Sequence, residues 1–139
     1  MTINYNPSIS TNALVIYFDA ANPPCYPGSG TAIRDLSGNG NNGTLYNSPT
    51  YSNGTIAFNG STNYIGVPNA TNLNPGSSNW SVVMWVNLAS VSGTYGGPIL
   101  YNKENLYESA HGSNAIEIAW QPSWAWYGTS SVTTGTWYQ

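Results

Sequence analysis

The chain has 139 residues, of which 5% are charged, against about 25% in an average soluble protein. Its two basic residues and net charge of −3 exclude a nucleic-acid surface, because neutralising phosphates requires several Lys or Arg on one face. Aromatic residues make up 14%, and 15 Gly and 9 Pro divide the chain into short apolar runs, so one all-β domain is expected.

The first part of the chain predicts an arm, a strand and a long loop. Residues 1–12 carry turn formers without a sustained period, so they predict an N-terminal arm ahead of one domain over residues 13–139. The apolar run 13–20 (ALVIYFDA) predicts a strand covered on both faces. Residues 22–43 predict a loop with one short strand near residues 31–36. Five glycines of this loop can take positive φ: Gly28, Gly30, Gly38, Gly40 and Gly43.

Two polar residues and one thiol of this loop carry specific expectations. Asp35 or Ser37 is expected to bond to nearby backbone amides within a turn. Cys25 is the single cysteine, so it cannot form an internal disulfide and is expected to be a buried or half-buried thiol.

Short strands separated by turns are predicted along the rest of the chain. In the segment 80–88 (WSVVMWVNL), Trp80, Val82, Met84, Val86 and Leu88 are expected on one face, and the other face is mixed and half covered. Tight turns are expected at residues 48–49, 52–54 and 59–60. The predicted strands are 43–46, 55–58, 63–67, 80–88, 98–102, 105–109, 114–121 and 124–128. Such a pattern is typical of a sandwich or barrel.

Three motifs in order resemble one family. They are the turn DLSGNGNNG (35–43), the segment IAFNGSTNYIGVP (56–68) and the Trp-rich segment 80–88. Together they resemble the LamG-type (laminin G-like) domains of the concanavalin A-like lectin/glucanase superfamily. The resemblance implies an antiparallel jelly-roll sandwich. The variant with DAANP and YPGSG ahead of the turn is similar to modules of phage structural proteins.

The resemblance also sets expectations about completeness and calcium. The segment 135–139 (GTWYQ) resembles a strand that lies mid-domain in the family, so we expect a C-terminally truncated fragment or a half-sandwich completed elsewhere. Many relatives carry Asp at the positions of Asn59 and Asn63, where carboxylates help to hold calcium. Neutral amides there disfavour calcium, because hard cations prefer carboxylate oxygens, and no other cofactor or metal is expected.

Catalysis is not expected. Glycoside hydrolysis of the superfamily's glucanase branch needs closely spaced carboxylates on one strand face, and no Glu-x-Asp-x-Glu run exists. Glu104 and Glu108 lie two strand steps apart, and Glu117 is isolated among apolar residues. His111 is interpreted as a loop histidine, because no activated Ser or Cys pattern accompanies it.

Aromatic side chains are the remaining candidates for binding a ligand. Trp120, Trp124, Trp126 and Tyr127 lie within eight residues and are the candidate ligand-binding residues. They either stack on sugar rings or fill the core and cover an interface, and the second interpretation is favoured because Trp and Tyr are enriched at interfaces.

The sequence therefore predicts a non-enzymatic structural or adhesion protein of a phage or viral particle, such as a head decoration, tail or fibre component. Its expected partners are other particle proteins or further copies of itself, with cell-surface glycans as a further class and no membrane insertion. Without the basic region of a secretory signal, it is expected to be made in the host cytoplasm and displayed on the virion surface. The alternative is an extracellular carbohydrate-binding module, either free-standing or cut from a larger secreted enzyme.

Overall fold

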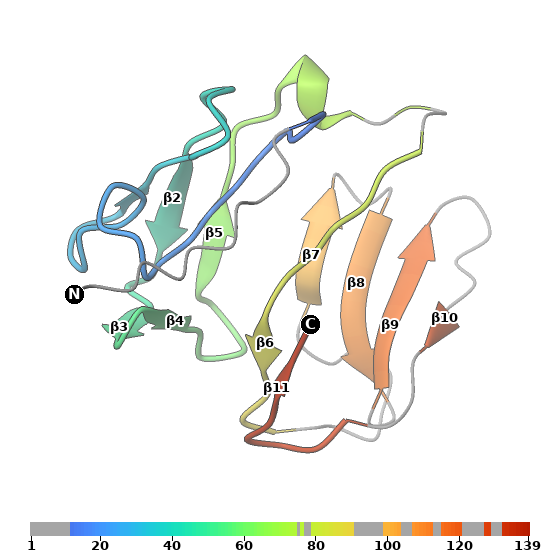
Figure 1. The fold of residues 1–139 in the computed structure, drawn as a ribbon. Helices are drawn as coiled ribbons and strands as arrows, with labels where there is room; N and C mark the ends of the chain where they lie inside the picture. Colours follow the sequence, from blue (N-terminus) through green and yellow to red (C-terminus); the bar gives the residue numbers. More distant parts are fainter. Residues whose placement is uncertain are drawn as a thin grey trace, which may run out of the picture. The chain divides into compact units, whose positions relative to one another are not determined.

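The computed structural model describes an all-β chain (Figure 1). Every strand pair in its described part is antiparallel, and that part contains one 3-10 turn, Thr71–Leu73, and no α-helix. The described residues are 12–74, 76, 79–90, 99–103, 107–112, 115–120, 127–128 and 132–139. Side chains are described for 12–74, 76, 79–90, 102 and 132–139. The all-β prediction is confirmed, whereas the jelly-roll arrangement stays a prediction.

The chain forms two compact units, Met1–Asn79 and Trp80–Gln139. The sequence predicts a single domain over residues 13–139, and that stays a prediction. The predicted arm, residues 1–12, lies outside the described residues except for Asn12.

The first unit contains a three-stranded sheet and a hairpin. The sheet has the order β1-β2-β5, and β3 pairs with β4. The turn of the hairpin, Asn53-Gly54, has φ values of 49° and 79°, the positive values that a two-residue type I′ turn requires. This turn was predicted, and so were all these strands except β3. Their bounds are β1 Ala32–Ile33, β2 Gly43–Tyr46, β3 Thr50–Ser52, β4 Thr55–Ala57 and β5 Tyr64–Gly66.

The core of the first unit lies on the inner face of the β1-β2-β5 sheet. Its buried members are Cys25, Tyr26, Ile33 and Leu45, so the buried thiol was predicted correctly. The half-buried residues Phe18, Leu36, Tyr51, Ile56 and Ile65 pack around them.

Gly43 is required by the packing of this core rather than by its backbone conformation. A Cβ atom at Gly43 would lie 2.8 Å from methyl carbons of both Ile33 and Ile65, closer than real Cβ contacts allow. The other four loop glycines do take positive φ, as predicted. Gly43 therefore lets two strands of the sheet bring their isoleucines together over β2.

The predicted strand at residues 13–20 is wrong. Residues 14–20 are half-buried, but they are not part of a described sheet ladder. The following loop holds their backbone instead, through one backbone bond, from the Leu36 amide to the Tyr17 carbonyl at 2.9 Å, and through several side chains. The Tyr17 amide donates to Asp35 Oδ1 at 2.9 Å, and the Val15 carbonyl accepts from Ser37 Oγ at 3.1 Å and from Asn41 Nδ2 at 2.8 Å. The apolar run predicted a strand covered on both faces, whereas residues 14–20 are only half-buried, and the run could not predict that side chains would replace a neighbouring strand.

The second unit contains a four-stranded sheet with the order β10-β9-β8-β7 and a separate pair, β11-β6. The four strands of this sheet overlap strands that the sequence predicts. Their bounds are β7 Ile99–Lys103, β8 Tyr107–Gly112, β9 Ala115–Trp120 and β10 Tyr127–Gly128. The pair consists of β6 Val86–Asn87 and β11 Trp137–Tyr138.

The predicted strand at residues 80–88 is confirmed only near its end. Residues 80–85 do not pair with any described strand, so β6 is short. The predicted alternation does hold around β6. Leu88 is buried and Met84 and Val86 are half-buried, whereas Trp85 and Asn87 are exposed. The second face was expected to be half covered, but Val83 is 71% exposed and Trp85 is 65% exposed.

Candidate functional site

The four predicted ligand-binding residues fall mainly outside the described part of the chain. Trp124 and Trp126 lie outside the described residues, and only the backbones of Trp120 and Tyr127 are described. Trp120 ends β9, and Tyr127 begins the neighbouring strand β10, where it is paired with Ile118. The structure therefore brings two of the four backbones onto adjacent strands, and the site stays a prediction.

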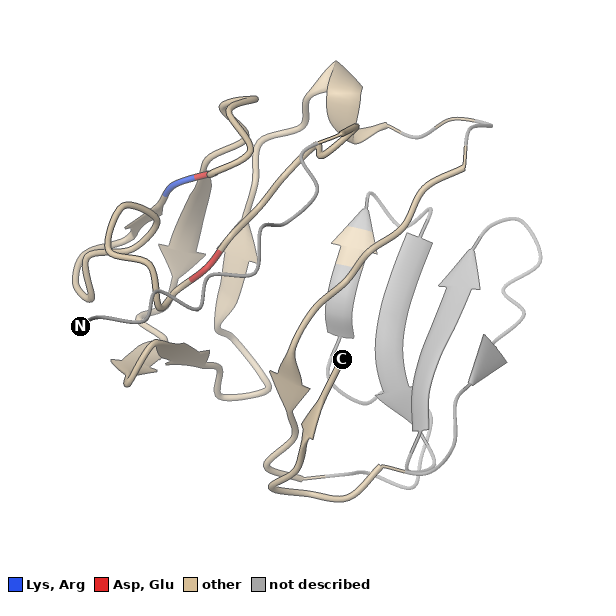
Figure 2. Ribbon diagram, viewed as in Figure 1, with Lys and Arg blue, Asp and Glu red and all other residues tan. Residues whose placement is uncertain are grey.

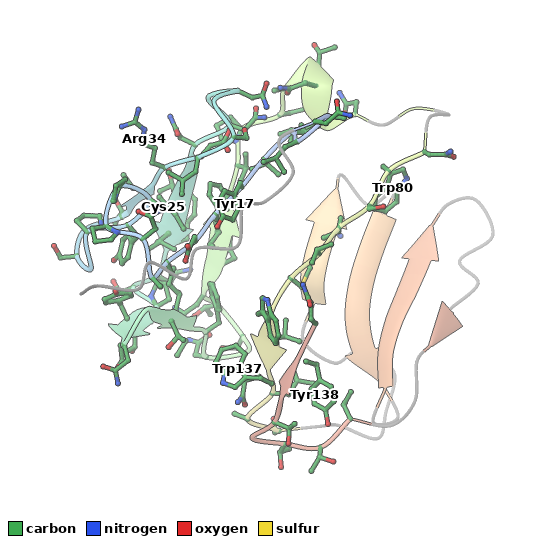
Figure 3. All side chains as sticks on the ribbon, in the orientation of Figure 1. Tyr17, Cys25, Arg34, Trp80, Trp137 and Tyr138 are labelled. Atoms are coloured by element: carbon green, nitrogen blue, oxygen red, sulfur yellow. The ribbon has the colours of Figure 1, made fainter. Side chains whose placement is uncertain are left out.

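An aromatic surface lies on the β6-β11 pair (Figure 3). Trp137 lies directly opposite Asn87 in the register, so both side chains leave the same face. Trp85 comes directly before β6, and if the alternation of that strand continues by one residue its side chain leaves the same face. Trp85 is 65% exposed and Trp137 is 51% exposed. We call Trp85, Asn87 and Trp137 the tryptophan face.

On the side opposite the tryptophan face, the β6-β11 pair is held by burial and by hydrogen bonds. Leu88 is buried, and its carbonyl accepts a hydrogen bond from the Gly135 amide at 3.0 Å. The Thr133 amide donates to the Tyr138 hydroxyl at 2.8 Å, which lowers the pKa of Tyr138. The tryptophan face is therefore displayed by a pair that is fixed from its opposite side.

Charge is concentrated in the first unit among the described side chains (Figure 2). They include Asp19, Arg34 and Asp35 there and no charged side chain in the second unit. Charged side chains on exposed strands are a common protection against pairing with other chains. Near the tryptophan face, the described residues supply no such protection.

A pocket of about 370 Å³ opens in the first unit between the loop after Tyr26 and the connection from β2 to β3. The Tyr26 and Tyr51 rings meet edge to face, with their centroids 5.2 Å apart. We call this cavity the tyrosine pocket. Its lining consists of Tyr26, Gly28, Ser29, Gly30, Thr31, Leu45, Ser48, Pro49 and Tyr51.

Sequence reasoning missed the tyrosine pocket. The loop glycines were recognised, but Tyr51 lies on the one strand of this unit that was not predicted. An aromatic residue between Pro49 and the Asn53-Gly54 turn was the available signal.

A buried carboxylate, Asp35, organises the loop of residues 35–43. Its two oxygens accept hydrogen bonds from the Tyr17, Ser37 and Asn41 amides and from the Ser37 hydroxyl, at 2.8 to 3.0 Å. Burial by itself raises the pKa of Asp35, but these hydrogen bonds, led by those from Ser37, outweigh it and hold the pKa below its ordinary value. The prediction that Asp35 or Ser37 bonds to backbone amides is confirmed, and the role of this carboxylate is structural.

A second polar loop surrounds Asn59 and Asn63. Asn59 Oδ1 accepts from the Ser61, Thr62 and Asn63 amides at 2.9 to 3.1 Å, and Asn63 Oδ1 accepts from the Asn59 amide at 2.9 Å. Asn63 Nδ2 donates to the Asn47 carbonyl at 2.6 Å, a bond that an ionised Asp could not make. Both amide oxygens thus accept hydrogen bonds from backbone amides.

The described part of the chain holds no group of three or more His, Cys, Asp or Glu side chains suited to a metal ion. It also holds no helix long and apolar enough to cross a membrane. Cys25 is buried, and burial, together with the nearby Asp19 and Asp35 charges, raises the pKa of its thiol above the ordinary value. A buried thiol with a raised pKa is a poor nucleophile.

Comparison with known proteins found no match: no family model matches the chain, and neither a curated protein nor a solved structure does. The likeness to LamG-type domains therefore rests on the sequence motifs alone.

Proposed function

We propose that this chain is a non-enzymatic structural or adhesion protein of a phage or viral particle, and that it assembles through the tryptophan face. The observation that carries the assembly step is the exposure of Trp85 and Trp137 on one face of the β6-β11 pair. Exposed aromatic clusters of this kind mark interaction surfaces, where Trp and Tyr are enriched.

A second copy of the chain is the partner that fits best. Soluble assemblies are most often closed homo-oligomers, in which the same patch of each subunit meets its counterpart. Trp85, Asn87 and Trp137 are all uncharged, so two tryptophan faces can meet without like-charge repulsion between these residues. The particle role is supported by the resemblance of DAANP (19–23) and YPGSG (26–30), ahead of the turn of residues 35–43, to modules of phage structural proteins.

Light scattering coupled to size-exclusion chromatography tests the assembly step. We expect the chain to form oligomers at micromolar concentration, and the double variant Trp85→Ser/Trp137→Ser to elute as a folded monomer. Phe58→Ser is the matched control, because Phe58 is a 46% exposed aromatic residue of the first unit. A monomeric wild-type chain, or a double variant as oligomeric as the control, would contradict assembly through this face.

The particle role has a separate test. We expect the coding gene to lie among capsid and tail genes, and mass spectrometry of purified particles to detect the chain. A gene that encodes a larger secreted enzyme containing this segment would instead support the alternative of an extracellular carbohydrate-binding module.

A further inference from the structure

We propose that Asn53 is a covalent modification site, where the fold directs spontaneous deamidation to one of the four Asn-Gly pairs of the chain. These pairs are residues 39–40, 42–43, 53–54 and 59–60. An Asn followed by Gly is the dipeptide most prone to this reaction, so the sequence alone makes all four candidates. The structure distinguishes the pair at 53–54, and the inference does not depend on assembly through the tryptophan face.

The reaction is a ring closure between an Asn side chain and the backbone of the next residue. The Gly54 amide nitrogen loses its proton to hydroxide and attacks Asn53 Cγ, so that an N–Cγ bond forms and the Cγ–Nδ2 bond breaks. The leaving amide group takes up a proton and departs as ammonia. Water then opens either carbonyl–nitrogen bond of the five-membered succinimide, which gives aspartate or isoaspartate. Glycine favours the closure because no Cβ stands in the way of the ring.

Hydrogen bonds hold the side chains of Asn39 and Asn59 in fixed positions. Asn39 Nδ2 donates to the Leu14 carbonyl at 2.8 Å and lies 3.1 Å from the Val15 carbonyl. Asn59 Oδ1 accepts from three backbone amides at 2.9 to 3.1 Å, and Asn59 Nδ2 donates to Thr62 Oγ1 at 2.9 Å. Cγ of either residue can reach the next amide only after these bonds break, which slows the ring closure.

The pair Asn42-Gly43 is protected by the strand that it begins. Gly43 is buried in β2 and is paired with Ile33 of β1. Asn42 Oδ1 accepts a hydrogen bond from the Asp35 amide at 3.0 Å. The attacking nitrogen of this pair therefore lies in a buried strand, where hydroxide and water have little access, and its side chain is held as well.

Asn53 lacks both kinds of protection. Its side chain is exposed and, within the described part of the chain, forms no hydrogen bond. In a two-residue turn, the closing backbone bonds join the flanking residues, here the paired Ser52 and Thr55. The Gly54 amide is therefore not needed for the ladder, and the Asn53 side chain can turn toward it without first breaking a bond.

The hairpin also requires the glycine that makes this turn reactive. Gly54 has a φ of 79°, and a Cβ there would lie 2.8 Å from the Cβ of Ala21. Any other residue at this position would strain the backbone and collide with Ala21. The reactive pair is thus a consequence of the turn and of its packing.

The two products should affect the hairpin differently. Aspartate keeps the length of the backbone, and Asp-Gly suits the same type I′ turn. In isoaspartate the main chain runs through Cβ and Cγ, so the turn contains one extra backbone atom. Ser52 and Thr55 then cannot close the turn in the same geometry, and we expect β3, which carries the core-packed Tyr51, to loosen from β4.

Peptide mass spectrometry of the full chain, after incubation in mildly alkaline buffer, tests the proposal. Fragment spectra follow the four pairs in native buffer and in denaturant, and Asp-N protease, which does not cleave before isoaspartate, separates the two products. In native buffer, Asn53 should react at least about fivefold faster than Asn39, Asn42 or Asn59, because each of these must first lose a hydrogen bond. In denaturant, the four rates should become similar.

Asn53→Gly is the matched variant, because Gly-Gly also suits the turn and carries no reactive amide. It should keep the circular dichroism of the wild type and release much less ammonia in native buffer. Faster reaction at one of the other three pairs in native buffer, or no reaction at Asn53 while the denatured chain reacts, would overturn the proposal. A preference for Asn53 that persists in denaturant would also overturn it, since the sequence rather than the fold would then select the site.

Discussion

Two polar loops of the first unit are both held by hydrogen bonds between side chains and backbone, but they use different side chains. In the loop of residues 35–43, a buried carboxylate, Asp35, collects four hydrogen bonds, one of them from Tyr17, which lies outside the loop. In the loop of residues 59–63, the side-chain amides of exposed Asn59 and half-buried Asn63 accept from backbone amides and also donate to other groups. A carboxylate suits a site that contains only donors, whereas an amide is needed where donors and carbonyls meet.

The comparison predicts its largest effect at Asp35. Asp35→Ala removes the acceptor for four donors in a buried site and should lower the free energy of unfolding by about 3 kcal/mol. Asp19→Ala is the matched control, because the Asp19 carboxylate accepts from the exposed Ala21 amide at 3.0 Å, and it should cost less than about 1 kcal/mol. Urea unfolding measures both. Equal costs at the two positions would show that Asp35 does not organise its loop.

Lowering the pH should remove the stabilisation by the Asp35 carboxylate without a mutation. The pKa of Asp35 is lower in the folded chain than in the unfolded chain, where it is about 3.9. Its contribution is therefore complete above that pH and is lost as the pH falls through the lower, folded-state pKa. Denaturant midpoints from about pH 6 to about pH 2 should show this loss in the wild type and a smaller one in Asp35→Asn. Identical acid profiles would contradict the assignment.

The second loop should show a smaller effect with the opposite dependence on pH. Asn63→Asp replaces the donor to the Asn47 carbonyl with a negative oxygen, which should cost about 1 to 2 kcal/mol at neutral pH. Protonation of the new carboxyl restores a donor, so acid should recover part of this loss relative to the wild type.

Asn59→Asp is the matched control for that change. Asn59 Oδ1 accepts three backbone amides, and Thr62 Oγ1, the partner of Asn59 Nδ2, carries a hydroxyl that can rotate to donate. The variant should therefore change the stability by less than about 0.5 kcal/mol. Similar losses for both variants in chemical unfolding would mean that charge, rather than the lost donor, decides the outcome.

The last prediction is that chelation of calcium has no effect on stability. The oxygens of Asn59 and Asn63 are engaged by backbone amides, so EDTA should leave the melting temperature unchanged. A lower melting temperature in EDTA that calcium restores would reveal a site formed by other oxygens.

The sequence was most informative where local residues decide the structure. β2 lies between turn formers, and the Asn53-Gly54 turn has a backbone that few other residue pairs adopt, so both could be predicted. The bonding of Asp35 and Ser37 within their own turn is also local.

Features that depend on distant partners could not be predicted. The segment 13–20 has the composition of a strand, but its backbone is held by side chains that follow it in the loop of residues 35–43. β3 has only three residues and owes its pairing to the hairpin turn. The tyrosine pocket needs Tyr26 and Tyr51 to meet, and no periodicity links them.

The position of the single cysteine allows the opening of the first unit's core to be measured by thiol labelling. Cys25 is 2% exposed at the centre of that unit's core, so a thiol reagent can reach it only when the packing around it opens. Because the chain has one cysteine, every labelled molecule records an opening of that one core. The labelling rate in native buffer, compared with that of the denatured chain, therefore measures how often the core around Cys25 opens.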